Sequence, residues 1–226
     1  MSELDRFEMD TLSTLGGDLE IVFLGHGSLL FRYGEQTIYV DPFGRVANYA
    51  LLPKADVIFI THDHQDHLDP EALDHVRIEN TIVVHAGVCE GMVDGGITMR
   101  NGDVTTVNGL TVEAVPAYNV LHMRENGNPF HPCGDGNGYV IGFADMRVYV
   151  AGDTENTPEM KAIRDIDVAF LPMNLPYTMT PEMVSDAARA IEPKILYPYH
   201  YGSTDTSRLV ELLAGSDIDV RIREMA

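Results

Sequence analysis

The sequence predicts a chain of the α/β kind, and three observations support this. The first half holds many short runs rich in β-branched and aromatic residues, bounded by Gly, Pro or Asp. The last third alternates such runs with segments of helical periodicity. No linker or internal repeat divides the 226 residues, so one domain over residues 1–226 is expected. Two sheets packed face to face with helices outside fit this pattern, and other α/β layouts fit it too.

The expected elements follow from apolar alternation and from the turn residues between the runs. Strands are expected at residues 19–24, 28–33, 36–40, 57–60, 81–85, 104–107, 110–115, 138–142, 147–151, 168–171, 194–199 and 220–223. Helices are expected at residues 70–76, 181–191 and 206–213. Asn108-Gly109 is a strong hairpin turn. Thr180-Pro181 is a strong helix start, because Thr caps the first turn and Pro suits its backbone.

Composition and charge narrow the class of protein. Hydrophobic residues make up 45% of the chain, and the formal net charge of -20 opposes binding to nucleic acid or anionic membranes unless bound cations reverse the field locally. The acidic start is unlike a signal peptide, and no apolar run approaches the roughly 18 residues that span a bilayer. Cys89 and Cys133 form no CxxC and indicate no disulfide framework. We expect a soluble cytoplasmic protein with a small-molecule substrate; a homo-oligomer is compatible with this.

The stretch FITHDHQDHLD, residues 59–69, is the strongest chemical signal in the sequence. Residues two apart in an extended segment point the same way, so His62 and His64 can bind one metal ion together. Asp66 and His67 follow on a turn and can face a second ion. Imidazole and carboxylate ligands suit zinc, manganese, iron or nickel, and two ions roughly 3.5–4 Å apart can share a hydroxide. The alternative is a solvated loop that happens to be rich in histidine.

These residues resemble the metallo-β-lactamase superfamily. Residues 61–67 match its signature loop, and residues 24–28 and 40–43 resemble the opening meander of short metal-dependent hydrolases related to ascorbate-6-phosphate lactonase. Residues 149–154 (YVAGDT) and 197–201 (YPYHY) resemble the motifs that supply a bridging carboxylate and a last histidine. The resemblance covers nearly the whole chain. It implies an α+β fold, a four-layer αββα sandwich, with a site for two metals at one edge.

The resemblance also implies a ligand set. The implied ligands are His62 and His64 for the first metal, Asp66, His67 and His200 for the second, and Asp153 between the two. Taken alone, Asp153 would be a turn residue and His200 a core histidine, but their order and spacing after the first cluster favour metal binding. The implied cofactors are two divalent ions, with zinc preferred and manganese, iron or nickel as alternatives.

One position departs from the family pattern. The family supplies a third histidine to the first metal from a strand end in the middle of the chain, and Asn119 stands there in this sequence. An amide oxygen is a weaker ligand than imidazole for such ions. The following loop offers His122 and His131, and the prolines at 129 and 132 restrict the backbone around His131. We hypothesise that His131 completes the first metal site; the alternatives are a loop-surface His131, or Asn119 as the ligand.

Other polar residues are weaker candidates. His26 and Asp41 could orient metal ligands or could be turn residues. His75 and His85 have no companion ligands and are interpreted as structural. The loop at residues 174–180 follows a strand at the expected site edge, where it could shape a pocket or serve only as a helix entry.

The expected function is metal-dependent hydrolysis. A hydroxide bridging two metals would attack an ester, lactone or phosphodiester bond of a small anionic substrate, and catalytic Asp66 would orient it or pass a proton to the leaving group. No substrate-binding residue is predicted. The resemblance leaves two alternatives open. One is an iron-dependent oxidoreductase, as in the persulfide dioxygenases, although the missing third ligand argues against it. The other is a metal-binding regulatory protein without turnover.

Overall fold

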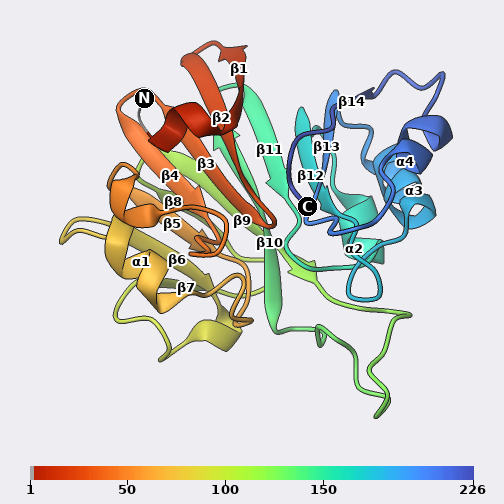
Figure 1. Cartoon of the computed structure of the whole chain (residues 1–226), viewed down its shortest axis with the longest axis horizontal. Coiled ribbons are helices and arrows are strands. Elements are labelled where there is room, and N and C mark those ends of the chain that lie inside the picture. The colour runs from red at the N-terminus through yellow and green to blue at the C-terminus, as the bar shows by residue number, and fades with distance from the viewer. Residues whose placement is uncertain (1–2) are drawn as a thin grey trace.

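Two seven-stranded sheets pack face to face with helices on both outer faces (Figure 1), in a computed structural model that describes residues 3–226. The strand order is β1-β2-β3-β4-β5-β6-β7 in the first sheet and β14-β13-β12-β11-β10-β9-β8 in the second. The N-terminal part of the chain therefore builds one half of the sandwich and the C-terminal part builds the other. The four-layer αββα arrangement implied by the resemblance is confirmed.

The strands and helices have the following bounds. The first sheet contains β1 (Glu8–Thr14), β2 (Gly17–Gly25), β3 (Ser28–Tyr33), β4 (Gln36–Val40), β5 (Val57–Ile60), β6 (Ile82–Ala86) and β7 (Ile97–Met99). The second contains β8 (Val104–Val107), β9 (Leu110–Ala117), β10 (Gly136–Phe143), β11 (Met146–Val150), β12 (Val168–Pro172), β13 (Ile195–Tyr199) and β14 (Asp219–Val220). The helices are α1 (Pro70–Val76), α2 (Pro158–Ala162), α3 (Pro181–Ile191) and α4 (Ser207–Leu212), with short 3-10 turns at Glu3–Arg6, Tyr49–Leu51 and Gly87–Cys89.

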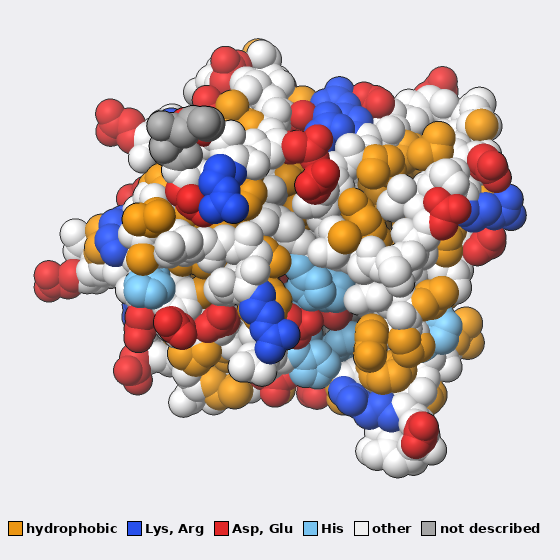
Figure 2. Space-filling model, in the orientation of Figure 1, with side chains coloured by type: hydrophobic (Ala, Val, Ile, Leu, Met, Phe, Trp, Pro, Cys, Tyr) orange, Lys and Arg blue, Asp and Glu red, His pale blue; other side chains and the backbone are white. Residues whose placement is uncertain are grey.

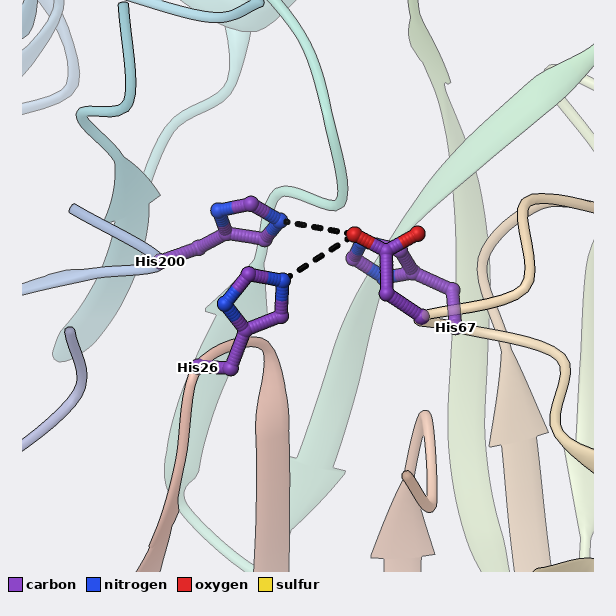
Figure 3. Close-up of side chains that lie close together, drawn as sticks. His26, His67 and His200 are labelled. Atoms are coloured by element: carbon purple, nitrogen blue, oxygen red, sulfur yellow. Dashed lines mark hydrogen bonds and ion pairs between the residues drawn. The ribbon is translucent and has the colours of Figure 1, made fainter. Parts of the chain in front are cut away.

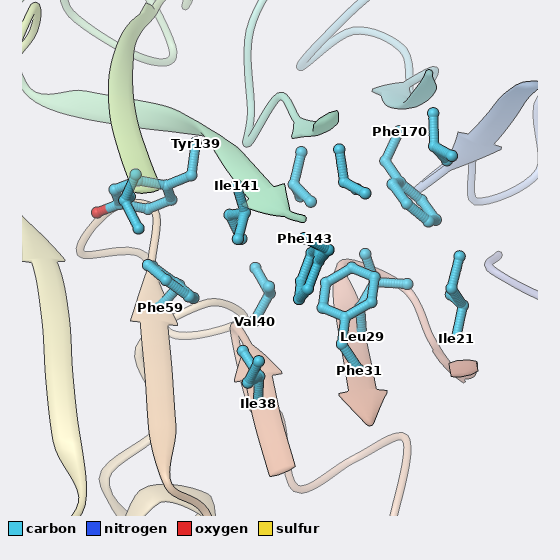
Figure 4. Close-up of a cluster of buried hydrophobic side chains, with 14 of the residues drawn as sticks. Ile21, Leu29, Phe31, Ile38, Val40, Phe59, Tyr139, Ile141, Phe143 and Phe170 are labelled. Atoms are coloured by element: carbon cyan, nitrogen blue, oxygen red, sulfur yellow. The ribbon is translucent and has the colours of Figure 1, made fainter. Parts of the chain in front are cut away.

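The central core lies between the two sheets (Figure 4). Phe31 and Phe59 of the first sheet meet Tyr139, Phe143 and Phe170 of the second, and all five are almost fully buried. Strand side chains alternate between the two faces of a sheet, so each strand sends every second residue into this layer. Aromatic pairs between the sheets thus fix the distance between the two layers.

The helices bury the opposite faces of the sheets. Ile58 and Ile60 of β5 pack in one outer cluster with Leu73 of α1, while Val57 and Phe59 point to the central core. In the second sheet β12 divides its side chains in the same way, and its outer residues pack under α3. Strands that are buried on both faces read as continuous apolar runs, which is why these two were predictable from sequence.

Several elements differ from the sequence-based expectation. β1, β7 and α2 were not expected; the exposed, polar β1 pairs with β2 along its whole length as an edge strand. The strand expected at residues 220–223 is wrong beyond Val220. The chain instead crosses to β1 there, because the Arg223 side chain bonds Asp10 and the Glu224 amide donates to a carboxylate oxygen of Glu8. No helix within residues 3–226 is both long and apolar enough to cross a membrane.

Candidate metal centre

The polar site lies where several strands end at one edge of the sandwich. Asp41 follows β4, His62 follows β5, Asp153 follows β11 and His200 follows β13. The four side chains are buried, with exposed fractions between 0% and 5%. Strand ends are rigid supports, so side chains at these positions are held in place by both sheets.

Three histidines form the first cluster. His62, His64 and His131 each offer a ring nitrogen, and these nitrogens lie within 4.8 Å of one another. The ring centroid of His131 is 5.1 Å from that of His62 and 4.9 Å from that of His64. The structure therefore brings His131, from the loop between β9 and β10, to the pair that the signature loop provides.

The second cluster contains His26, Asp66, His67 and His200, whose ligand atoms also lie within 4.8 Å of one another. In Figure 3 the rings of His26 and His200 point at one carboxylate oxygen, which is Oδ2 of Asp66. The Nε2 atom of His26 is 3.0 Å from this oxygen, and the Nε2 atom of His200 is 3.7 Å from it. His26 is not one of the implied ligands, but it contacts Asp66 directly.

Asp153 lies between the two clusters. Its Oδ2 is 3.3 Å from Nε2 of His131, and its Oδ1 is 3.5 Å from Nε2 of His67 and 3.6 Å from Nε2 of His200. One oxygen thus faces each cluster. A carboxylate in this position could contact a cation in either cluster.

Four buried polar atoms of the site lack a hydrogen-bond partner among the described residues. They are Nε2 of His62, Nε2 of His67, Nε2 of His200 and Oδ1 of Asp153. Leaving a buried polar atom unpaired costs free energy, so native proteins rarely do so without a reason. Nitrogen and carboxylate donors that converge in this way fit a divalent ion such as zinc, manganese, iron or nickel.

Asp41 contacts two residues of the site, His67 and Thr61, from behind the clusters. Its Oδ2 lies 2.7 Å from Nδ1 of His67 and accepts a hydrogen bond of 2.6 Å from the Thr61 hydroxyl, and its Oδ1 accepts from the Thr61 amide. The Thr61 hydroxyl lies 3.0 Å from Nδ1 of His62. In both histidines the inner ring nitrogen is therefore engaged, and Nε2 is left to face the site.

Asn119 positions His131. Its side-chain oxygen accepts a hydrogen bond of 2.8 Å from the His131 amide and lies 2.8 Å from Nδ1 of the same residue. Its side-chain amide donates to the Tyr177 carbonyl. Since the amide oxygen is already occupied by His131, Asn119 holds the histidine that stands in the first cluster. Sequence reasoning treated the two residues as alternatives, and the structure joins them.

Glu155 is a site residue that sequence reasoning missed. Its carboxylate is fully buried and accepts hydrogen bonds of 2.6 to 2.8 Å from the amides of Val120, Leu121 and His122. Burial alone would raise the pKa of Glu155, but these amide bonds outweigh it and lower the pKa below its ordinary value. Glu155 thus anchors the start of the loop that carries His131. Its only signal in the sequence is its place two residues after Asp153.

Backbone conformation also marks the site. His26, Asp41 and His200 have φ angles of 54°, 46° and 47°, a left-handed conformation that non-glycine residues rarely adopt. Such strain persists only where the surroundings impose it, and it concentrates at functional sites. Gly27 permits the close packing here, since a Cβ at that position would lie 2.9 Å from Cε1 of His67.

The carboxylates and histidines of the site shift each other's pKa values. Burial alone would lower the pKa of His67, but Asp153 and Asp41 raise it well above its ordinary value. Burial would raise the pKa of Asp153, whereas His200 and His67 hold it well below its usual range. These opposite shifts show that His67 and Asp153 are electrostatically coupled across the site.

All seven ligand candidates from the sequence meet at this edge. His122 stays apart from both clusters, with Nδ1 2.6 Å from Oε1 of Glu155. His75 lies on α1 and His85 in β6, outside the clusters. The 174–180 loop contributes Asn174 and Tyr177 to a cavity of about 480 Å³ over the site.

The fold and this site define a class of protein, and sequence comparison names it. The profile of the Beta-lactamase superfamily domain matches residues 20–200. The chain belongs to that superfamily, in which it is a metal-dependent hydrolase of the metallo-β-lactamase fold.

Relatives with more specific names match most of the chain. A UPF0173 metal-dependent hydrolase of Methanoculleus marisnigri is 32% identical over 189 residues, which cover 81% of each chain. A UPF0173 metal-dependent hydrolase of Methanopyrus kandleri is 30% identical over 225 residues, 91% of this chain and 97% of the relative. The crystal structure of a metal-dependent hydrolase from Parabacteroides distasonis has 46% sequence identity and a TM-score of 0.93, and covers 97% of this chain and 100% of that one. Within the superfamily, the chain groups with the UPF0173 metal-dependent hydrolases.

Proposed function

We propose that the protein hydrolyses an ester, lactone or phosphodiester bond of a small anionic substrate, using two divalent metal ions. The observation that carries the proposal is the set of unpartnered buried atoms on His62, His67, His200 and Asp153, which converge from strands of both sheets. Atoms left unpaired in this way favour a site that is completed by cations.

The two clusters suggest how the ions would be shared. His62, His64 and His131 would hold one ion, Asp66, His67 and His200 the other, and Asp153 would contact both. Zinc suits this mixture of imidazole and carboxylate, and manganese, iron and nickel are the alternatives. When bound, the ions would lower the pKa of a water molecule and polarise the oxygen of the bond to be cleaved.

Asp66 is the proposed catalytic residue. It is the most exposed carboxylate of the site, with 37% of its side chain accessible, so a substrate can reach it. Burial alone would raise the pKa of Asp66, but His200 and His26 hold it well below its usual range, so it stays ionised. An ionised carboxylate can accept a hydrogen bond from the attacking water and orient it, and can pass the proton to the leaving group. His26, 3.0 Å away, would fix the orientation of Asp66.

The test is metal content measured together with turnover. Protein purified without added metal is analysed by mass spectrometry for metal per chain, and activity is measured on bis-p-nitrophenyl phosphate and on a panel of lactones and esters. We expect two equivalents of a divalent ion and turnover of at least one of these bond types. Iron together with oxygen uptake would replace the proposal with an oxidoreductase. Bound metal without turnover of any class would point to a regulatory protein.

The assignment of His131 has its own measurement. His131→Ala is expected to bind one equivalent more weakly than the parent, with the second equivalent unchanged. If the variant binds both equivalents as tightly as the parent, His131 is not a ligand. An anomalous-scattering map of metal-loaded crystals would give the number of ions and the atoms that contact each.

A further inference from the structure

Two arginines on the rim of the site lack a carboxylate partner among the described residues. Arg45 lies in the loop after β4, and Arg124 lies in the loop between β9 and β10. Most other basic side chains pair with a carboxylate within 4.0 Å, for example Arg32 with Glu20 at 3.0 Å. With 35 acidic and 15 basic residues in the chain, an arginine that faces a cavity with its charge uncompensated is unexpected.

Arg124 is held in place without being neutralised. Its Nη2 donates to the Phe130 carbonyl over 3.2 Å, and its Cζ lies 5.0 Å from the centroid of the Phe130 ring. Phe130 in turn packs edge-on against Tyr177, with ring centroids 5.0 Å apart. Arg124 lines the cavity of about 480 Å³ together with His64 and Asp153. Its remaining donors are free to bind an anion.

Arg45 lies on the side of the second cluster. Its Cζ is 5.8 Å from the centroid of the Phe43 ring, which packs against His26. Arg45, Gln65, His26, Phe43 and Asp66 line a depression of about 270 Å³. This depression shares His26, Gln65 and Asp66 with the cavity over the site.

A wider groove continues the depression away from the site. It has a volume of about 580 Å³ and shares Phe43, Arg45 and Gln65 with the depression. The three hollows thus form one series, with Arg124 lining its first member and Arg45 lining the other two. Figure 2 shows Lys and Arg side chains beside the histidine side chains at the centre of this face.

We propose that Arg45 and Arg124 bind two anionic groups of one substrate, each a carboxylate or a phosphate, on either side of the bond that the metal centre cleaves. This rests on the proposed function and adds the substrate class and the residues that recognise it. A guanidinium matches both groups because its planar fork can donate two parallel hydrogen bonds. In a chain of net charge -20, these local positive charges would also attract an anion that the rest of the surface repels.

Binding is tested first, independently of turnover. The probes are propane-1,3-dicarboxylate (glutarate) and propane-1,3-diyl bisphosphate, titrated calorimetrically into metal-loaded protein. The two probes share a spacer, so they distinguish carboxylate from phosphate recognition. Arg45→Gln and Arg124→Gln are each expected to weaken the preferred probe about tenfold, as the loss of one charge-assisted hydrogen bond would. The matched control is Arg208→Gln on α4, which removes the same charge outside the cavity and should leave binding unchanged.

Turnover then tests the role in catalysis. The substrates are the mono-p-nitrophenyl ester of glutarate and the same ester with the free carboxylate replaced by a carboxamide. This ester carries one free carboxylate, on one side of the bond that is cleaved. One of the two arginine substitutions, the one that removes the partner of this carboxylate, is therefore expected to raise its KM about tenfold, with kcat within about twofold of the parent. The uncharged ester should respond to neither substitution.

The outcomes separate this proposal from the proposed function. If the double variant binds both probes as tightly as the parent, the arginines do not recognise the substrate. The same follows if its KM rises as much for the uncharged ester as for the charged one. Neither result contradicts the proposed hydrolysis. If the probes bind in an arginine-dependent way but the parent cleaves no ester, lactone or phosphodiester, the anion-binding role of the arginines is supported and the proposed hydrolysis is refuted.

Discussion

Two polar clusters of the sandwich, one buried and one partly buried, differ in whether their atoms are paired. At the metal centre, Nε2 of His67 and Oδ1 of Asp153 have no hydrogen-bond partner within the described chain. At another edge, Asp10 of β1 accepts hydrogen bonds from the Tyr197 hydroxyl and from both Nη2 and Nε of Arg223, and Arg221 lies 3.3 Å away.

This difference predicts that the Asp10 cluster contributes to the stability of the fold and that the candidate metal centre serves in metal binding. The Asp10 cluster is complete in itself, and it ties the first strand to the C-terminal segment across the edges of both sheets. At the candidate metal centre the unpaired atoms come from residues that follow β5, β11 and β13, as expected of a site that is completed by a ligand. Substitutions in the Asp10 cluster should therefore change the free energy of unfolding. Substitutions at the candidate metal centre should change metal binding and turnover.

The largest expected effect is that of His64→Ala. Loss of a ligand to one ion should lower kcat/KM by about a thousandfold or more, which corresponds to about 4 kcal/mol of transition-state stabilisation. Metal content, measured by mass spectrometry, should fall with it. The melting temperature of the metal-free protein should stay near that of the parent, because His64 is only half-buried. His75→Ala, on the exposed face of α1, is the matched control, and retained activity in His64→Ala would refute the site.

A smaller effect is expected from Asn119→Ala. The substitution removes the oxygen that orients His131, so the affinity for one of the two ions should fall about 10- to 100-fold. Competition with a chelator of known affinity measures both binding steps. Leu121→Ala, in the same loop with a side chain that is 70% exposed, serves as the control. Unchanged affinity for both ions would show that Asn119 has no positioning role.

Asp10→Asn should leave the metal centre intact and destabilise the fold. It removes the charge that Arg221 and Arg223 share, and the expected cost is about 2 kcal/mol, typical of hydrogen bonds to a charged group. Urea denaturation measures the loss, and kcat/KM of the metal-loaded variant should equal that of the parent. Glu182→Gln breaks an exposed ion pair and should not shift the urea midpoint. If Asp10→Asn loses activity without losing stability, the Asp10 cluster does not act through stability alone and this prediction is wrong.

The smallest effect is a pH dependence at the same cluster. Burial alone would raise the pKa of Asp10, but hydrogen bonds from Tyr197 and Arg223 lower it below its ordinary value of 3.8. A group whose folded pKa is depressed contributes stability above its unfolded pKa and loses it as the pH falls through the folded pKa. The stability difference between the parent and Asp10→Asn should thus be constant near neutral pH and shrink below about pH 4. A difference that stays constant down to pH 3 would contradict this.

The sequence by itself determined the elements with strong local patterns. The runs at β5 and β12 are apolar throughout because both faces of each strand are buried. The start of α3 follows from Thr180, whose side chain accepts a hydrogen bond from the Met183 amide. The pair His62 and His64 follows from a spacing of two after a strand, which places both side chains near one point. These features depend on neighbours in the chain, so local rules are sufficient for them.

Only the tertiary structure decided how distant segments meet. It joins Asn119 to His131 across the loop, places buried Glu155 beneath that loop, and closes the sandwich from Asp10 to Arg223. It also puts Arg45 and Arg124 along one series of hollows. A residue's type and spacing limit which chemistry it can perform, but loops that are far apart in sequence converge only through the packing of the sheets that carry them. The contacts that complete this site are of that kind.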